Sequence, residues 1–143
     1  MTVPLWSLLA FATRTILLLL GTVGVYRWAR ILTGRVPIRE FRADRVEGDD
    51  WYKRAMRAHA NCIENLPVFA VIVLALGASG TAGPGIDRIC MGIVAARVVQ
   101  SAIHVGMAPT NTAASLRFAF FFVQLAGFLA LIALIVAQAW PPQ

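Results

Sequence analysis

Four long apolar stretches alternate with shorter polar segments along the chain. They cover about residues 3–26, 54–78, 86–105 and 118–140. A helix that crosses a hydrocarbon core about 30 Å thick needs about 20 residues, which each stretch supplies. Glycine and proline cluster between the second and third stretches, as expected for a tight turn. The pattern predicts an all-α fold, an integral membrane four-helix bundle with up-down topology that forms a single domain over residues 1–143.

The second stretch differs from the others because its uninterrupted apolar part is short. This part, Leu66 to Ala78, would be only about 20 Å long as a helix. A short re-entrant segment is one interpretation, but the number of crossings would then be odd. The other is a full span that begins near residue 54 and has a polar first half. We expect the full span, which carries several polar residues into the bilayer: Arg57, His59, Asn61, Glu64 and Asn65.

The composition agrees with a membrane protein. Hydrophobic residues make up 59% of the 143 residues and charged residues 14%, and the mean hydropathy is +0.71. These values exclude a water-soluble enzyme with one buried core, a disordered chain and a disulfide-stapled secreted module. Cys62 and Cys90 lie inside apolar segments without metal or redox spacing, so we expect both to be buried small side chains and predict no metal site.

The net charge of +6 raises the question of nucleic-acid binding, which the distribution of charge argues against. Eight of the 13 Lys and Arg residues lie between Arg27 and Arg54, interleaved with acidic residues. A mixed-sign loop between apolar stretches is typical of a cytoplasmic loop, so we predict no nucleic-acid partner. The positive-inside rule then places loop 27–53 in the cytoplasm and both termini on the non-cytoplasmic side. The Ala-, Arg- and Gly-rich composition favours a bacterial inner membrane.

Ionisable residues inside a bilayer indicate a functional site, and here they share helix faces. At about 100° per residue, Arg57, Asn61 and Glu64 fall within roughly 60° of one another, with Arg54 beside them. Up-down topology brings this face to the same half of the bundle as Arg117 and the polar residues of the third helix. Those third-helix residues are Arg97, Gln100, Ser101 and His104. We therefore predict a polar pocket that is accessible from the cytoplasm.

The residue types in this pocket suit a small, flexible anion with several carboxylates. Arginines bind carboxylates in a forked geometry, Glu64 can hold an ammonium group and Asn61 can bond a peptide amide. A guanidinium also favours the thiolate form of a bound thiol. Glutathione carries all of these groups. The competing interpretations are a structural ion pair between Arg57 and Glu64, an interfacial anchoring role for Arg117, and pairing of Arg14 with Glu64 of the same or a neighbouring subunit.

The run from Arg54 to Phe69, RAMRAHANCIENLPVF, resembles the signature of the MAPEG family, the membrane-associated proteins of eicosanoid and glutathione metabolism. The resemblance implies a homotrimer that binds glutathione as co-substrate between adjacent subunits, with a lipophilic acceptor entering from membrane lipid. It implies that Arg117 activates the thiol. It also implies a set of glutathione-binding residues, which by position are Arg54, Arg57, Asn61, Glu64, Arg97, Gln100 and His104.

The chain departs from the family pattern at several aromatic positions. Gln100 and His104 occupy positions where family enzymes often have His and Tyr, and the chain's only tyrosines are Tyr26 and Tyr52. We expect a glutathione-dependent transferase or peroxidase that acts on lipophilic electrophiles or lipid hydroperoxides. The alternatives are a non-catalytic lipid-binding or scaffold protein of the same fold, and a small proton-coupled transporter with Glu64 as its proton site.

Overall fold

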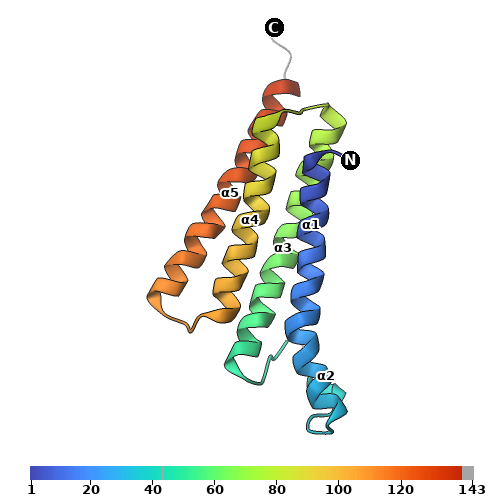
Figure 1. Cartoon of the computed structure of the whole chain (residues 1–143), viewed down its shortest axis with the longest axis vertical. Helices are drawn as coiled ribbons and strands as arrows, with labels where there is room; N and C mark the ends of the chain where they lie inside the picture. Colours follow the sequence, from blue (N-terminus) through green and yellow to red (C-terminus); the bar gives the residue numbers. More distant parts are fainter. Residues whose placement is uncertain (43, 140–143) are drawn as a thin grey trace.

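The structure, a computed structural model, describes residues 1–42 and 44–139, and all of its regular elements are helical. A π-helical turn, Leu19–Gly24, joins the first two helices into one rod, and a short 3-10 turn, Ile38–Glu40, lies in the loop that follows. The main helices are α1 (Val3–Leu18), α2 (Val25–Leu32), α3 (Asp50–Ser79), α4 (Pro84–Gly106) and α5 (Asn111–Ala139). The all-α prediction is therefore confirmed (Figure 1).

Four helical segments are long and apolar enough to cross a membrane: Val3–Leu32, Asp50–Ser79, Pro84–Gly106 and Asn111–Gln138. The chain is therefore a multi-pass integral membrane protein. α3 is one unbroken helix of 30 residues, or about 45 Å at 1.5 Å per residue. This length rules out the short re-entrant interpretation and supports a span with a polar first half.

At two places the helices extend beyond the expected spans. The first helical rod continues past residue 26 to Leu32, because the residues after the apolar stretch form an amphipathic turn that packs on the start of α3. The last helix begins at Asn111 rather than at residue 118, so the preceding loop contains only residues 107–110. The expected end of the last span at Trp140 lies outside the described residues.

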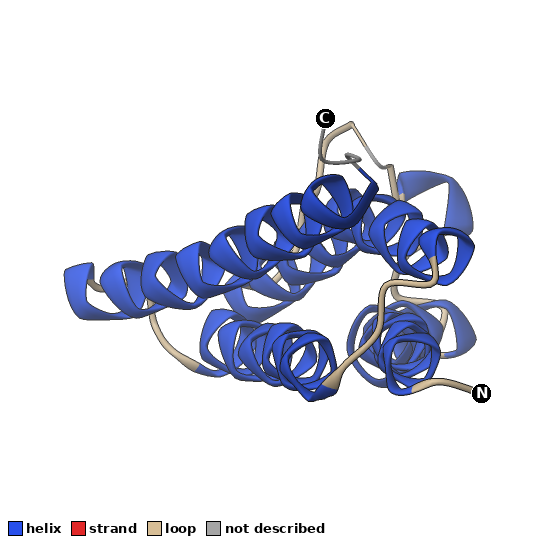
Figure 2. Ribbon diagram, turned by 90° about the horizontal axis from the view of Figure 1, so that it is seen from above, coloured by secondary structure: helices blue, strands red, loops and turns tan. Residues whose placement is uncertain are grey.

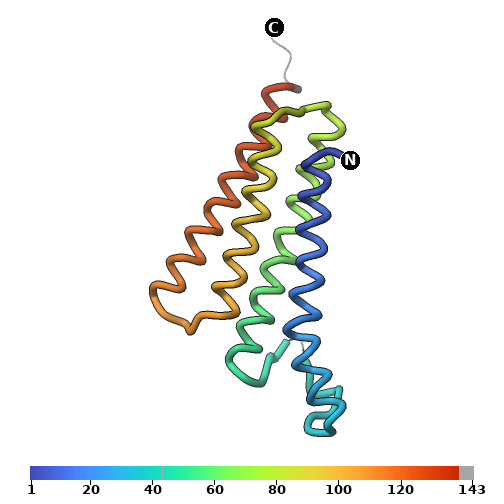
Figure 3. Tube along the Cα trace, viewed as in Figure 1, coloured from blue at the N-terminus to red at the C-terminus, as the bar shows by residue number. Residues whose placement is uncertain are grey.

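Successive long helices run in opposite directions, which gives the predicted up-down topology (Figures 1 and 3). The loop of residues 33–49 and the turn of residues 107–110 lie at one end, which we call the loop end. The beginning of α1, the end of α5 and the α3–α4 turn lie at the other end. Gly80, with φ of 67°, ends α3 in the left-handed conformation that glycine tolerates. The placement of the loop end in the cytoplasm stays a prediction.

The apolar core fills the half of the bundle that is remote from the loop end. Seen from above, the helices pack side by side (Figure 2), and α5 packs chiefly along α4. Residues from all four spans meet there, including Phe11, Phe69, Ile93, Phe128 and Leu131. Because this half is closed by apolar packing, polar side chains gather in the other half.

A second cluster fixes the loop end. The rings of Tyr26 and Tyr52 stack with centroids 4.0 Å apart. Arg27 Nε donates a hydrogen bond to Tyr52 Oη at 2.8 Å, and the Asp49 amide donates to Tyr26 Oη at 3.0 Å. Arg30 pairs with the Asp49 carboxylate at 2.8 Å. Both tyrosines of the chain therefore hold the start of α3 against α2.

The close packing of α4 on α5 gives a stability prediction. A Cβ atom at Gly127 would lie 2.8 Å from Ile93 Cγ1, whereas one at Gly92 would meet nothing within 4 Å. We expect Gly127→Leu to destabilise the protein by about 1–3 kcal/mol through overpacking. Thermal unfolding in detergent measures this loss, and Gly92→Leu is the matched control. Equal unfolding temperatures for the two variants would contradict the helix contact.

Candidate functional site

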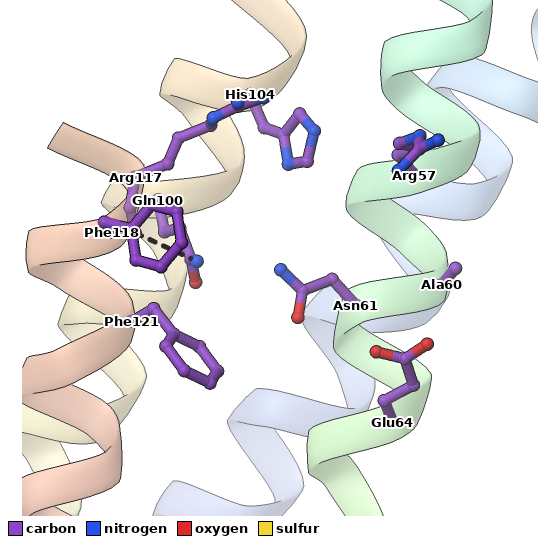
Figure 4. Close-up of a pocket in the computed structure, with 9 residues that line it drawn as sticks. All are labelled: Arg57, Ala60, Asn61, Glu64, Gln100, His104, Arg117, Phe118 and Phe121. Carbon is purple, nitrogen blue, oxygen red and sulfur yellow. Dashed lines mark hydrogen bonds between the residues drawn. The ribbon is translucent and has the colours of Figure 1, made fainter. Parts of the chain in front are cut away.

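A cavity of about 450 Å³ opens between α3 and the α4–α5 pair near the loop end (Figure 4). Its volume falls within the roughly 300–1,000 Å³ that is usual for small-ligand sites. Three helices supply its lining: Arg57, Ala60, Asn61, Glu64, Gln100, His104, Arg117, Phe118 and Phe121. The cavity thus unites six of the eight residues that the sequence proposed for the site.

The polar face of α3 forms one wall. Arg57, Asn61 and Glu64 follow one another at intervals of four and three residues, which places them on one side of the helix. Asn61 points into the cavity (Figure 4). Its Oδ1 accepts a hydrogen bond at 3.1 Å from Asn65 Nδ2, which also donates to the Asn61 carbonyl at 2.8 Å. Asn65 therefore fixes the orientation of the Asn61 amide.

Arg57 and Glu64 are both exposed on the single chain. Within the described residues no salt bridge joins them to each other or to another side chain. The interpretation of a structural Arg57–Glu64 ion pair is therefore wrong for this chain. Unpaired charges are expensive at bilayer depth. The two side chains thus present a cation and an anion to whatever covers the cavity.

A chain of amides ties α4 to α5 behind the cavity. Gln100 Nε2 donates to the Arg117 carbonyl at 3.2 Å. Gln124, which has no exposed surface, donates from Nε2 to Gln100 Oε1 at 2.9 Å and to the Phe120 carbonyl at 2.8 Å. Gln100 therefore braces the turn of α5 that carries Arg117. Sequence reasoning missed Gln124, although a lone amide inside the last apolar stretch was the available signal.

The opposite wall combines charged and apolar groups. His104 and Arg117 lie together toward the loop end, and Phe118 and Phe121 form the apolar part of the wall (Figure 4). Because α5 begins at Asn111, Arg117 lies in its second turn rather than at its start. This placement sets its guanidinium beside the cavity instead of leaving it in the loop. Phe121, like Phe118, lines the cavity.

Two proposed ligand residues lie outside the cavity. Arg54 donates from Nε to the Val105 carbonyl at 3.3 Å, so it ties α3 to the end of α4. Arg97 is 1% exposed, and its guanidinium carbon lies 5.5 Å from the centre of the Phe11 ring on α1. A long helical side chain leans toward the N-terminal end of its helix. The side chain of Arg97 therefore lies on the side of α4 that faces α1, and not on the side that faces the cavity.

Arg14 bonds a cysteine within the described chain, and its pairing with Glu64 of a neighbouring subunit stays a prediction. Its Nη1 donates to Cys62 Sγ at 3.3 Å, and it makes no ion pair with Glu64 within the chain. Cys62 and Cys90 are both buried and belong to the apolar core, as expected. His59 does not line the cavity, and its Nδ1 is buried without a hydrogen bond.

The cavity therefore offers two guanidiniums, one carboxylate, an amide and an imidazole, next to two phenyl rings. Such a set can hold a ligand with several carboxylates and an ammonium group while an apolar molecule lies against the rings. In the part of the chain that the structure describes, no group of three His, Cys, Asp or Glu side chains is placed to hold a metal ion.

Comparison with known proteins agrees with this architecture. The model of the MAPEG family matches residues 3–137, nearly the whole chain. No curated protein and no solved structure gives a significant match. The family match and the four apolar helices point to the same class of membrane protein. The chain belongs to the MAPEG family, the membrane proteins of eicosanoid and glutathione metabolism.

Proposed function

We propose that this protein is a membrane-bound glutathione-dependent transferase or peroxidase of a bacterial inner membrane. The observation that carries the proposal is the cavity in which Arg57, Arg117, Glu64 and Asn61 converge from two helices. Its acceptors would be lipophilic electrophiles or lipid hydroperoxides. The loop end would face the cytoplasm, from which glutathione would enter.

The charges of the cavity fit glutathione, which has two carboxylates and one ammonium group. Arg57 and Arg117 supply two cations for the carboxylates or the thiolate, and Glu64 supplies an anion for the ammonium group. Asn61, held by Asn65, presents its amide to a peptide group. Because Arg57 and Glu64 have no ion-pair partner in the described chain, binding would satisfy charges that are otherwise unpaired.

The bound thiol would supply the nucleophile, whose sulfur forms a bond to the electrophilic carbon while the leaving group departs with its electron pair. Arg117 would stabilise the thiolate electrostatically. Gln100 and Gln124 would act as positioning residues, since their hydrogen bonds fix the turn that carries Arg117. Phe118 and Phe121 would orient the apolar acceptor.

We also propose that the protein is a homotrimer. Arg57 and Glu64 are exposed on the single chain at the depth of the spans. Leaving them against lipid would be costly, and an adjacent subunit would cover them and complete the site.

A second function is favoured by one observation. Among the residues that the structure describes, no tyrosine, serine or cysteine lines the cavity, and the two tyrosines are stacked on each other at the loop end. If Arg117 alone activates the thiol, the reaction would be slow. This observation therefore favours a non-catalytic role, either in lipid binding or as a scaffold.

Glutathione binding is the first test. We expect Arg57→Ala and Glu64→Ala to lower the affinity about 10–100-fold, because each removes a charge-assisted hydrogen bond. Calorimetric titration in detergent with glutathione and with S-methylglutathione measures this loss. Arg88→Ala is the control, since Arg88 lies exposed at the other end of α4. Unchanged affinity in both variants would reject the site.

Turnover separates the two functions. We expect Arg117→Ala to lower kcat for conjugation of a generic aryl halide about a hundredfold, with little change in KM, because it removes the charge that stabilises the thiolate. Arg117→Lys should recover part of the rate. A wild-type protein that binds glutathione but conjugates nothing would support the non-catalytic role instead.

Native mass spectrometry of the detergent-released protein tests the oligomer. We expect three copies of the 15.5 kDa chain. A monomer or dimer under the conditions that preserve glutathione binding would refute the trimer while leaving the cavity assignment intact.

A further inference from the structure

The cavity contains an imidazole whose role the binding of charges does not explain. His104 lies in the last turn of α4 and is half-buried at the loop end. Its ring points from α4 toward α3, and the side chain of Arg117 reaches toward it from α5 (Figure 4). The imidazole therefore lies on the side of the cavity where Arg117 would stabilise a thiolate.

Two of the described side chains that line the cavity can accept a proton. Arg57 and Arg117 remain protonated, and the amides and phenyl rings are not bases near neutral pH. Glu64 and His104 remain. Histidine is the side chain that most often serves as a general base in enzymes. The position of each group relative to the thiol decides between them.

The two candidate bases lie at different depths in the bundle. Arg54 Nε donates to the Val105 carbonyl at 3.3 Å, so the end of α4 lies level with Arg54. Glu64 follows Arg54 by ten residues, or about 15 Å along α3 at 1.5 Å per residue. Glu64 is therefore far from the turn that carries His104, where it would bind the ammonium group of glutathione. His104 is the base on the side of Arg117.

The charged groups around His104 are guanidiniums. Arg117 comes from α5, and Arg57 and Arg54 come from α3. The adjacent Val105 packs on the tyrosine cluster at the loop end, so this turn of α4 meets apolar groups on its other side. Guanidiniums stabilise a neighbouring thiolate. The turn therefore combines a proton acceptor with the cations that stabilise the anion left behind.

We propose, on the basis of the proposed function, that His104 is the general base that takes the proton of the bound thiol. An imidazole nitrogen receives this proton, and the electron pair of the S–H bond stays on the sulfur beside Arg117. The sulfur uses the pair to bond the electrophilic carbon of an aryl halide, and the halide leaves with the electron pair of the broken carbon–halogen bond. The imidazolium then gives its proton to water at the loop end. Arg117 does not activate the thiol alone.

The pH dependence of conjugation in detergent is the first test. We expect His104→Gln to lower kcat for a generic aryl halide about a hundredfold at pH 7, because the base is lost. The loss should shrink as the pH rises, because the thiolate then forms without the imidazole. A purely structural defect would lower kcat equally at every pH. His59→Gln is the matched control, since His59 does not line the cavity and the variant should keep the wild-type profile.

Added imidazole tests the proton transfer itself. In His104→Ala, external imidazole should raise kcat at least about tenfold at pH 7, because it can enter at the loop end and replace the missing base. Arg117→Ala should not respond to imidazole, since it retains His104 and lacks the cation. Calorimetric titration with S-methylglutathione, which has no thiol proton, should give nearly wild-type affinity in both His104 variants and thereby shows that their sites are folded.

The outcomes separate this inference from the proposed function. Active wild-type protein together with an unchanged kcat in His104→Gln, or with a loss that is equal at every pH, would overturn the role of His104 and leave the transferase intact. Wild-type protein that conjugates nothing would refute both. If the His104 variants do not fold, the wild-type profile still decides, because a rate that rises in proportion to hydroxide over the whole range would show that no base acts.

Discussion

The expense of placing charge inside a bilayer is the constraint on which the rest of this structure depends. α3 begins with Asp50 and carries Arg54, Arg57 and Glu64 before its apolar half starts. A membrane protein keeps such residues only where they face the protein interior, a cavity or a partner. The bundle provides two such places, one on each side of α3. Its other half is packed with apolar side chains and holds the helices at fixed positions.

The two sides of α3 are used differently. Asn61 faces the cavity with α4 and α5, whereas the adjacent Cys62 faces α1 and the inner side of α4. Consecutive helical residues differ by about 100° in direction, so one turn of helix serves both places. The cavity contains charges of both signs and is open to a ligand. On the other side of α3, Arg14 donates a hydrogen bond to the buried sulfur of Cys62.

The amide chain behind the cavity explains how α5 is positioned. Without an anchoring contact, an apolar helix can slide or rotate against its neighbour, because lipid and protein offer similar apolar surroundings. Gln124 and Gln100 supply a directional contact in the middle of the α4–α5 interface. About one turn further along α5, Gly127 allows Ile93 to approach closely. Together they fix the position of Arg117 relative to α4.

The sequence by itself determined the number of helices, their alternation and the half of the bundle in which polar residues gather. Hydropathy and helical periodicity contain that information, since both depend on residues near one another in the chain. It also placed Arg57, Asn61 and Glu64 on one face. Only the tertiary structure decided that Arg97 turns toward Phe11, that Arg14 bonds Cys62 and that Gln124 holds Gln100. Long side chains can reach several neighbours from one helical position, and the packing of the other helices selects among them.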